Sequence, residues 1–346
     1  VARIKILSSL RLDEKRLPQD GRFKIETPEE KVSFRVSILP VYNGEKVVLR
    51  LLHEGAKGFS LEALGLTENQ IDKIQKSMRR SNGMILVTGP TGSGKTTTLY
   101  TVLDILNKPG VNISTVEDPI EYQMPRINQS QVKPEIGFSF SNGLRSLLRQ
   151  DPDIIMVGEI RDNETASLAV NAALTGHLVL STLHTNSAAG AIPRLLDMKV
   201  EPFLLVSTLN MIVAQRLVRR LCKTKEKYFL DKDQLKELGG VVDLDRMLGI
   251  LKEQKVVETG ASWEKIPFYK TKQTKDCPDG YFDRVGIHEA LEMTETIKNL
   301  VMKDSSSDDI EKQAKKDGMI TMLEDGIIKA AQGVTSVEEV LRVTSE

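Results

Sequence analysis

Residues 89 to 96 form a complete phosphate-binding loop. They fit the pattern G-x-x-x-x-G-K-[ST] and read Gly89-Pro90-Thr91-Gly92-Ser93-Gly94-Lys95-Thr96. Glycines let backbone N–H groups turn inward around phosphates, the Lys95 amine can reach the β and γ oxygens, and Thr96 offers a hydroxyl to Mg²⁺. An apolar run precedes the loop, and Thr97 follows it at the start of a helical stretch, so we expect strand, loop and helix with a bound nucleoside triphosphate. The expected ATP-binding residues are those of the loop, 89–96, and Thr97. A purely structural glycine loop is the alternative.

A second acidic group follows another apolar run. Residues 153–157 lead into Gly158-Glu159-Ile160-Arg161-Asp162. Glu159 stands where a carboxylate can hold Mg²⁺ through water or position the attacking water in phosphoryl transfer. Arg161 is a further phosphate or structural candidate. The alternative for Glu159 is an exposed strand-end carboxylate without a role.

Three carboxylates lie at and just after the end of the apolar strand expected at 112–117, namely Glu117, Asp118 and Glu121. Asp118 and Glu121 are further phosphate or structural candidates. Clustered acids repel one another unless a cation or an arginine lies among them. Glu117 is the preferred general base for water, with Glu159 as its competitor. A solvated turn is the alternative for this segment.

Two of the four histidines, His177 and His184, flank one apolar strand. His184 follows the strand and is placed to donate to a γ-phosphate oxygen as a sensor of hydrolysis, whereas a core histidine with satisfied hydrogen bonds is the alternative for both. Arg35 and Arg50 lie in the polar register of an N-terminal hairpin, and Arg22 follows a Pro-Gln-Asp-Gly turn. Planar guanidinium groups suit phosphate oxygens, but a solvated hairpin face explains them equally well.

The elements that must position these residues alternate between strand and helix. Residues 32–38 and 47–52 predict a β-hairpin around Asn43-Gly44, and glycines 55 and 58 predict a linker over 53–59. A helix is expected over 61–80. Apolar strands at 84–88, 112–117, 153–158 and 178–183 alternate with helical stretches, which predicts a parallel α/β sheet with its chemistry at the carboxyl ends of the strands.

The remaining sequence is less regular. A long amphipathic helix is predicted beyond Pro202 through 214–220, then a lysine-rich inserted region, then a closing bundle of short helices. The chain of 346 residues exceeds the size of one core. The predicted domains are an N-terminal α+β domain (1–52), the linker (53–59), a nucleotide-binding core (60–221), an inserted subdomain (222–290) and a C-terminal helical subdomain (291–346).

Composition narrows the function classes. There are 48 basic and 48 acidic side chains, so no global positive field favours nucleic acid. No stretch is apolar enough for a membrane span, and nothing resembles an export signal. Two cysteines, Cys222 and Cys277, predict no disulfide framework and fit a reducing compartment. The expected localisation is therefore cytoplasmic.

Taken together, these motifs resemble the GspE/PilB family of type II secretion and type IV pilus assembly ATPases. The resemblance covers nearly the whole chain and includes Arg-Leu-Pro-Gln-Asp-Gly-Arg at 16–22, the segments around Arg35 and Arg50, the phosphate loop, Val-Glu-Asp-Pro-Ile-Glu-Tyr at 116–122, the stretch 147–162, Thr-Gly-His through Thr-Asn at 175–186, Ala-Gln-Arg-Leu at 214–217 and Asp-Gly-Ile at 325–327. The segments at 116–122, 147–162 and 175–186 are similar to the family's Asp box, atypical Walker B and His box.

The resemblance implies a RecA-like ATPase that uses ATP and Mg²⁺ and assembles as a homo-hexamer. It also implies that Arg35 and Arg50, and less strongly Arg22, approach the phosphates from a truncated N-terminal domain, with Mg²⁺ held by Thr96 and Glu159. Closure and opening of the two domains is expected to turn an inner-membrane platform protein that adds pilins or pseudopilins. The protein is then peripheral at the inner face of the cytoplasmic membrane, without insertion into it and without nucleic acid.

The sequence departs from the family at its cysteines. Lys225 stands where a C-x-x-C pair needs its second cysteine, and Thr274 likewise precedes Cys277, so no zinc site is expected there. The retained region 222–280 and the chain's ending resemble the assembly branch rather than the retraction branch. A pilus retraction ATPase, a DNA-uptake or DNA-translocating ring motor, and a nucleotide-dependent scaffold that does not hydrolyse ATP remain the alternatives.

Overall fold

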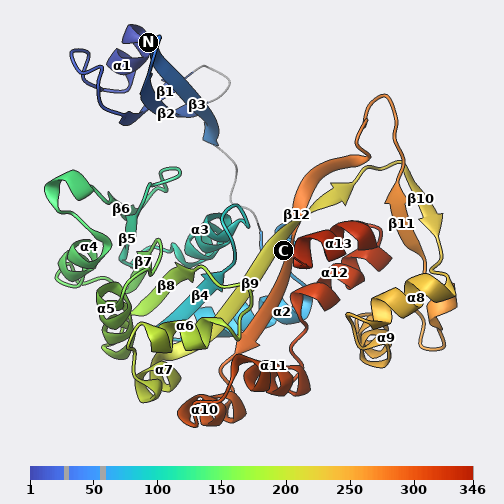
Figure 1. Ribbon diagram of the computed structural model, residues 1–346. Coiled ribbons are helices and arrows are strands. Elements are labelled where there is room, and N and C mark those ends of the chain that lie inside the picture. Colours follow the sequence, from blue (N-terminus) through green and yellow to red (C-terminus); the bar gives the residue numbers. More distant parts are fainter. Residues whose placement is uncertain (27–30, 55–59, 346) are drawn as a thin grey trace. The chain divides into compact units, whose positions relative to one another are not determined.

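The computed structural model describes residues 1–26, 31–54 and 60–345. The chain divides into two compact units (Figure 1). The first holds Val1–Phe59 and Pro119–Pro125, and the second holds Ser60–Asp118 and Arg126–Glu346. Of the expected linker, residues 53 and 54 belong to a strand, and 55–59 lie outside the described residues.

The first unit contains a three-stranded antiparallel sheet that follows helix α1 (Ala2–Leu7). Its strands, in spatial order, are β1 (Gln19–Glu26), β2 (Lys31–Val41) and β3 (Gly44–Glu54). The pairing of β2 with β3 confirms the predicted hairpin. Phe23 stacks on Phe34 with ring centroids 4.9 Å apart, and Val36 and Ile38 are fully buried, so this small sheet has an apolar face.

The opposite face of this sheet carries a row of arginines. Arg22 lies directly opposite Arg35, and Arg35 lies directly opposite Arg50. Residues directly opposite in a ladder share one face of the sheet. The prediction of a turn at Arg22 is wrong, because Gly21 and Arg22 pair with β2 inside strand β1, and this pairing overrides the local turn signal.

The second unit is built on a seven-stranded sheet, and its strands in spatial order are β12 (Tyr281–Glu292), β9 (Leu209–Leu221), β4 (Gly83–Thr88), β8 (Leu178–Leu183), β7 (Ile154–Val157), β5 (Ile113–Glu117) and β6 (Ile127–Gln131). All neighbours are parallel except β12, which runs antiparallel to β9. Every residue of β4, β5, β7 and β8 is buried, as expected for parallel strands that are covered on both faces. The predicted α/β fold with a parallel sheet is confirmed.

Helices cover both faces of this sheet (Figure 1). From β4 to β5 the chain crosses the sheet in one direction through α3 (Lys95–Leu106), and it returns through β7 and β8 to β9 in the other. Right-handed crossovers then place α3 on one face and the return helices on the other. The return helices are α4 (Phe140–Leu147), α5 (Asn163–Leu174), α6 (Ala191–Asp197) and α7 (Pro202–Thr208), with a short 3₁₀ turn at Pro134–Ile136.

Two helix predictions are wrong: one predicted helix is a strand, and the other is shorter than predicted. Residues 214–220 belong to β9, because pairing with β4 and β12 overrides a pattern that fits a helix in isolation. The helix predicted over 61–80 is α2 (Glu68–Met78), which begins later. Gly65 adopts φ 96°, and a capping box between Thr67 and Gln70 fixes the start of α2 after it.

The inserted region and the C-terminal bundle complete the second unit. The antiparallel pair β10 (Lys225–Tyr228) and β11 (Phe268–Thr271) encloses α8 (Lys232–Gly239), α9 (Leu244–Glu253) and a 3₁₀ turn at Trp263–Lys265. The predicted closing bundle consists of α10 (Glu295–Met302), α11 (Ser307–Lys316), α12 (Met322–Ala331) and α13 (Val337–Thr344). The expected boundary at 290 falls inside β12, which joins the main sheet.

Cys222 and Cys277 form a disulfide, so the expectation of no disulfide is wrong and these cysteines do not support a reducing compartment. Their separation of 55 residues gives no sign of it. The antiparallel register pairs Leu221 with Tyr281, which brings the end of β9 to the start of β12 and the two cysteines together. A disulfide offers no thiolate to a metal ion.

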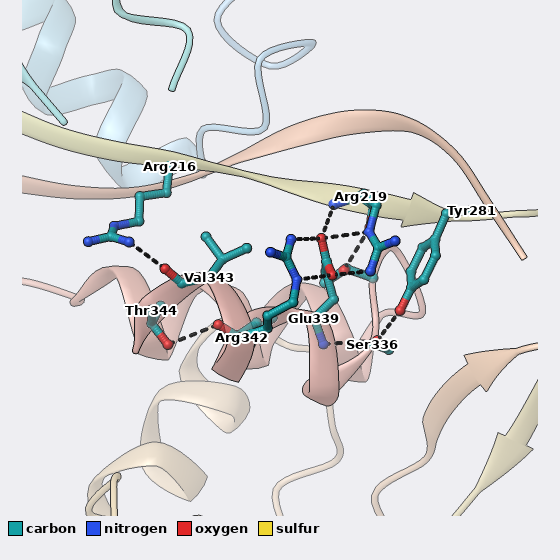
Figure 2. Close-up of polar contacts among 10 residues, drawn as sticks. Arg216, Arg219, Tyr281, Ser336, Glu339, Arg342, Val343 and Thr344 are labelled. Atoms are coloured by element: carbon teal, nitrogen blue, oxygen red, sulfur yellow. Dashed lines mark hydrogen bonds and ion pairs between the residues drawn. The ribbon is translucent and has the colours of Figure 1, made fainter. Parts of the chain in front are cut away.

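A buried carboxylate fastens helix α13 to strand β9. Figure 2 shows Glu339 between the guanidinium groups of Arg219 and Arg342. Arg219 donates from its backbone N at 3.1 Å, from Nε at 2.9 Å and from Nη2 at 2.6 Å, and Arg342 donates from Nη2 at 2.9 Å. Arg219 also stacks on Tyr281, with its Cζ 4.1 Å from the ring centroid. Burial raises the pKa of Glu339, but these hydrogen bonds outweigh it and lower the pKa to about 2.

Replacing Glu339 by glutamine is expected to lower the free energy of unfolding by at least about 2 kcal/mol at pH 7, because the buried carboxylate accepts several charged hydrogen bonds. Glu339 has a depressed pKa, so its stabilisation is complete above the unfolded value near 4.5 and is lost as pH falls toward about 2. Below pH 4.5 the difference between the two proteins should shrink by about 1.4 kcal/mol per pH unit. Urea denaturation at several pH values measures this.

The exposed neighbour Glu338 supplies the matched control. The variant Glu338→Gln removes the same charge from the same helix and should change the unfolding free energy by less than about 0.5 kcal/mol. Equal effects of the two substitutions would contradict the role assigned to Glu339.

Candidate active site

The strand order brings the predicted site residues to one edge of the large sheet. Strands β4, β8, β7 and β5 are consecutive neighbours and parallel, so their carboxyl ends lie at the same edge. The phosphate loop follows β4, His184 follows β8, Glu159 follows β7 and Glu117 ends β5. Neighbouring strands are about 4.8 Å apart, so Glu159 lies one strand nearer to the phosphate loop than Glu117.

The phosphate loop has the backbone that an anion cradle needs. Gly89, Gly92 and Gly94 adopt φ values of 146°, 81° and 90°, which L side chains rarely adopt. Gly94 is the N-cap of α3, so the loop opens onto a helix N-terminus, which favours phosphate. The buried Ser93 hydroxyl has no hydrogen-bond partner among the described residues. These features fit a bound nucleoside triphosphate.

Lys95 spans the loop. Its Nζ donates to the carbonyl oxygens of Gly89 at 2.8 Å and of Pro90 at 3.0 Å. Burial lowers the pKa of Lys95, and the negative charge of Glu159 partly offsets this. That electrostatic interaction places the Glu159 carboxylate in the field of the loop lysine.

Glu159 is held by two partners. Its side chain is 11% exposed. Its Oε1 forms an ion pair with Arg161 Nη2 at 2.6 Å, and its Oε2 lies 3.2 Å from His184 Nε2. The hydrogen bond with Glu159 raises the pKa of Arg161, and the charge of Asp118 adds to this. The cluster therefore joins two predicted catalytic side chains, and His184 remains about half exposed.

Glu117 lies in a buried hydrogen-bond network. The residue is 1% exposed, and it accepts hydrogen bonds from Thr115 Oγ1 at 2.5 Å, from Gln129 Nε2 at 3.1 Å and from the Tyr100 hydroxyl. Tyr100 stands four residues after Thr96, so both lie on one face of α3. Glu117 thus contacts the helix that follows the phosphate loop.

Several predicted residues lie elsewhere. His177 flanks β8 at its amino end, opposite to the site, and its Nδ1 donates to the Ala172 carbonyl at 2.9 Å, although the residue is only partly buried. Arg22, Arg35, Arg50 and Glu121 belong to the first unit. The position of the arginine row relative to the phosphate loop therefore stays a prediction.

Sequence reasoning missed four polar residues that support the site, namely Tyr100, Thr115, Gln129 and Gln215. For Tyr100 the signal was its spacing of four from Thr96 on a predicted helix. Gln215 stood in a recognised motif, but its assignment to a helix hid the contact that its strand makes with the loop. Nothing in the sequence identifies Gln129 as a residue near the site, and the strand that carries it, β6, was not predicted.

Comparison with known proteins identifies the family of this chain. Residues 1–342 match the family described as Type II/IV secretion system protein. A type II secretion system protein E from Xanthomonas campestris is 48% identical over 100% of this chain, and the type IV pilus assembly ATPase PilB of Pseudomonas aeruginosa is 44% identical over 100% of it. The chain spans 58% of the length of each of these relatives.

Solved structures agree on the fold. The pilus retraction motor PilT with bound ADP has a TM-score of 0.67 at 28% identity and covers 94% of this chain and 77% of its own. The ATPase DotB of Yersinia pseudotuberculosis has a TM-score of 0.68 at 22% identity, with 95% and 76% covered, and shows the fold alone. Within the part of the chain that the structure describes, no helix has both the length and the apolar composition of a transmembrane span.

The family match over residues 1–342 and the two relatives show that the chain belongs to the Type II/IV secretion system protein family.

Proposed function

We propose that this chain is the motor part of a Mg²⁺-dependent ATPase that powers type IV pilus assembly or type II secretion. The observation that carries the proposal is the complete phosphate loop beside Glu159 and His184 at the carboxyl edge of a parallel sheet. The names of the relatives support it, because they are secretion proteins E and pilus assembly ATPases.

The residues take separate roles in the proposed reaction. Lys95 and the loop amides bind the β and γ phosphates. Glu159 orients the attacking water in place of Glu117, the base preferred from the sequence, because Glu159 follows the strand nearer to the phosphate loop. His184 contacts the γ-phosphate and reports its loss. Thr96 and Glu159 would hold Mg²⁺, which supplies charge neutralisation at the phosphate oxygens. Glu117, with its oxygens held by three donors, fixes the helix that carries Thr96 and competes with Glu159 for the role of base.

The arginine row of the first unit is proposed to contact the γ-phosphate. Replacing Arg35 or Arg50 by glutamine is expected to lower kcat about tenfold, because each removes one of several cations that balance charge in the transition state. Steady-state phosphate release measures this. Arg22→Gln should have the same direction and a smaller size.

Arg16→Gln is the charge-matched control, because Arg16 is an exposed arginine that precedes β1 outside the row. It should leave kcat within about twofold of the parent. Unchanged turnover in the double variant of Arg35 and Arg50 would remove the row from the catalytic proposal.

The working assembly is proposed to be a homo-hexamer at the cytoplasmic face of the inner membrane. ATP binding favours closure of the two units and hydrolysis removes that bias, so the cycle delivers motion to a membrane platform protein that adds pilins or pseudopilins. Light scattering with and without an ATP analogue tests the hexamer, and copurification with a platform protein of the same organism tests the partner.

Assembly is proposed over retraction. The retraction motor is 28% identical to this chain, whereas the assembly ATPase is 44% identical over the whole chain. Deleting the gene should therefore abolish surface pili or secretion. Intact pili that fail to retract would identify a retraction motor instead.

A further inference from the structure

Gln215 lies on the strand that runs beneath the phosphate loop. Strand β9 pairs in parallel with β4, and Ala214 stands opposite Thr88, the last residue before the loop. The next residue, Gln215, is 2% exposed. It is therefore a buried polar side chain at the point where the chain leaves the sheet to form the loop.

Both polar atoms of the Gln215 side chain are used. Its Nε2 donates to the carbonyl oxygen of Ser93 in the loop at 2.7 Å. Its Oε1 accepts from the hydroxyl of Thr98 on helix α3 at 2.7 Å. One side-chain amide thus connects strand β9, the phosphate loop and the first turn of α3.

Gln215 also fits closely against the loop with both its main chain and its side chain. A Cβ atom on Gly89 would lie 2.4 Å from the Gln215 carbonyl oxygen, and one on Gly94 would lie 3.2 Å from Nε2. Gln215 therefore lies against both ends of the loop, and a glycine at each end leaves room for this close contact.

The hydrogen bond to Ser93 orients a loop amide. In a planar trans peptide the C=O and the following N–H point in opposite directions. When Gln215 holds the Ser93 carbonyl toward β9, the N–H of Gly94 points away from β9. That N–H belongs to the N-cap residue of α3, where helix N–H groups bind phosphate.

We propose that Gln215 is a positioning residue that sets the loop amides for phosphate binding without touching the nucleotide. The inference rests on the proposed function, because it concerns the same nucleotide. It predicts that losing the side-chain amide weakens nucleotide binding beyond any loss of fold stability.

The test compares two buried amides of the same strand. Gln215→Met removes the donor to Ser93 and keeps the side-chain length. Asn210→Leu is the matched control, because Asn210 is 5% exposed on β9, donates to the Asn82 carbonyl at 3.0 Å and accepts from Arg80 Nη1 at 2.9 Å, at the end of β4 away from the loop. Both variants should lower the melting temperature similarly.

The Kd for Mg·ADP, measured by calorimetry, should separate them. Gln215→Met should raise it at least about tenfold and Asn210→Leu by less than about twofold. Equal Kd values for Gln215→Met and the parent would overturn the inference. Parent protein that is folded yet binds no ADP would instead refute the proposed function.

A second variant covers the case in which Gln215→Met does not fold. Thr98→Val removes the hydroxyl that holds the Gln215 amide, and it should raise the Kd for Mg·ADP by about threefold. Added to Gln215→Met it should change nothing further, because both act through one hydrogen-bonded chain. Unchanged ADP binding in Thr98→Val, or independent additive effects in the double variant, would overturn the inference.

Discussion

Lys95→Ala is expected to reduce ATP hydrolysis at least about a thousandfold and to weaken ADP binding strongly, because the ammonium group supplies a full charge to the β and γ phosphates. In the structure this amine lies across the loop, bonded to the Gly89 and Pro90 carbonyls and in the field of Glu159. The side chain is only partly buried, so the fold should survive its removal. Phosphate release and ADP calorimetry measure the two effects.

Two further variants sharpen this prediction. Lys95→Arg keeps the charge but replaces a compact ammonium by a wider planar group, and it should also be inactive. Lys108→Ala removes an exposed lysine just after α3 and should leave turnover unchanged. A Lys95→Ala protein that hydrolyses ATP at more than about a tenth of the parent rate would contradict the assignment.

The sequence predicted the α/β fold and the edge of the sheet at which the candidate residues lie. The phosphate loop, Glu159 and His184 lie at that edge because each follows an apolar strand, and parallel strands end at one edge. Local sequence is sufficient for such a prediction, since the chemistry depends on residues next to strand ends.

Features that depend on long-range pairing were missed. Strand β9 looked like a helix because its burial comes from β4 and β12, which lie far away in the sequence. The Cys222–Cys277 disulfide and the strand position of Arg22 follow from antiparallel registers in the same way. The spacing of apolar residues reflects which side chains are buried, and in these segments the burial comes from strands that are distant in the sequence.

The misassigned strand also concealed a functional link. Gln215 supports the phosphate loop, while Arg219 on the same strand holds the C-terminal helix through Glu339. A helix over 214–220 would have separated these contacts from the loop. Strand β9 therefore connects the nucleotide site to the C-terminal bundle through one rigid element of the sheet.

Glu159→Gln is expected to lower kcat about a hundredfold or more while the Kd for ADP measured without Mg²⁺ stays within about threefold, because the loss concerns water activation and the metal rather than phosphate binding by the loop. Glu159 lies one strand nearer to the loop than Glu117, pairs with Arg161 and His184, and acts electrostatically on Lys95. Single-turnover hydrolysis and ADP titration distinguish the two effects. Glu164→Gln, at an exposed carboxylate on α5, is the control and should be silent.

Glu117→Gln tests the competing assignment. Glutamine turns one of the two acceptor oxygens into a donor inside the network of Tyr100, Thr115 and Gln129, so this variant should lose melting temperature as well as some turnover. Glu159→Gln should keep its melting temperature, because its partners Arg161 and His184 remain exposed to water. Near-normal turnover in Glu159→Gln, with Glu117→Gln folded and inactive, would transfer the role of base to Glu117.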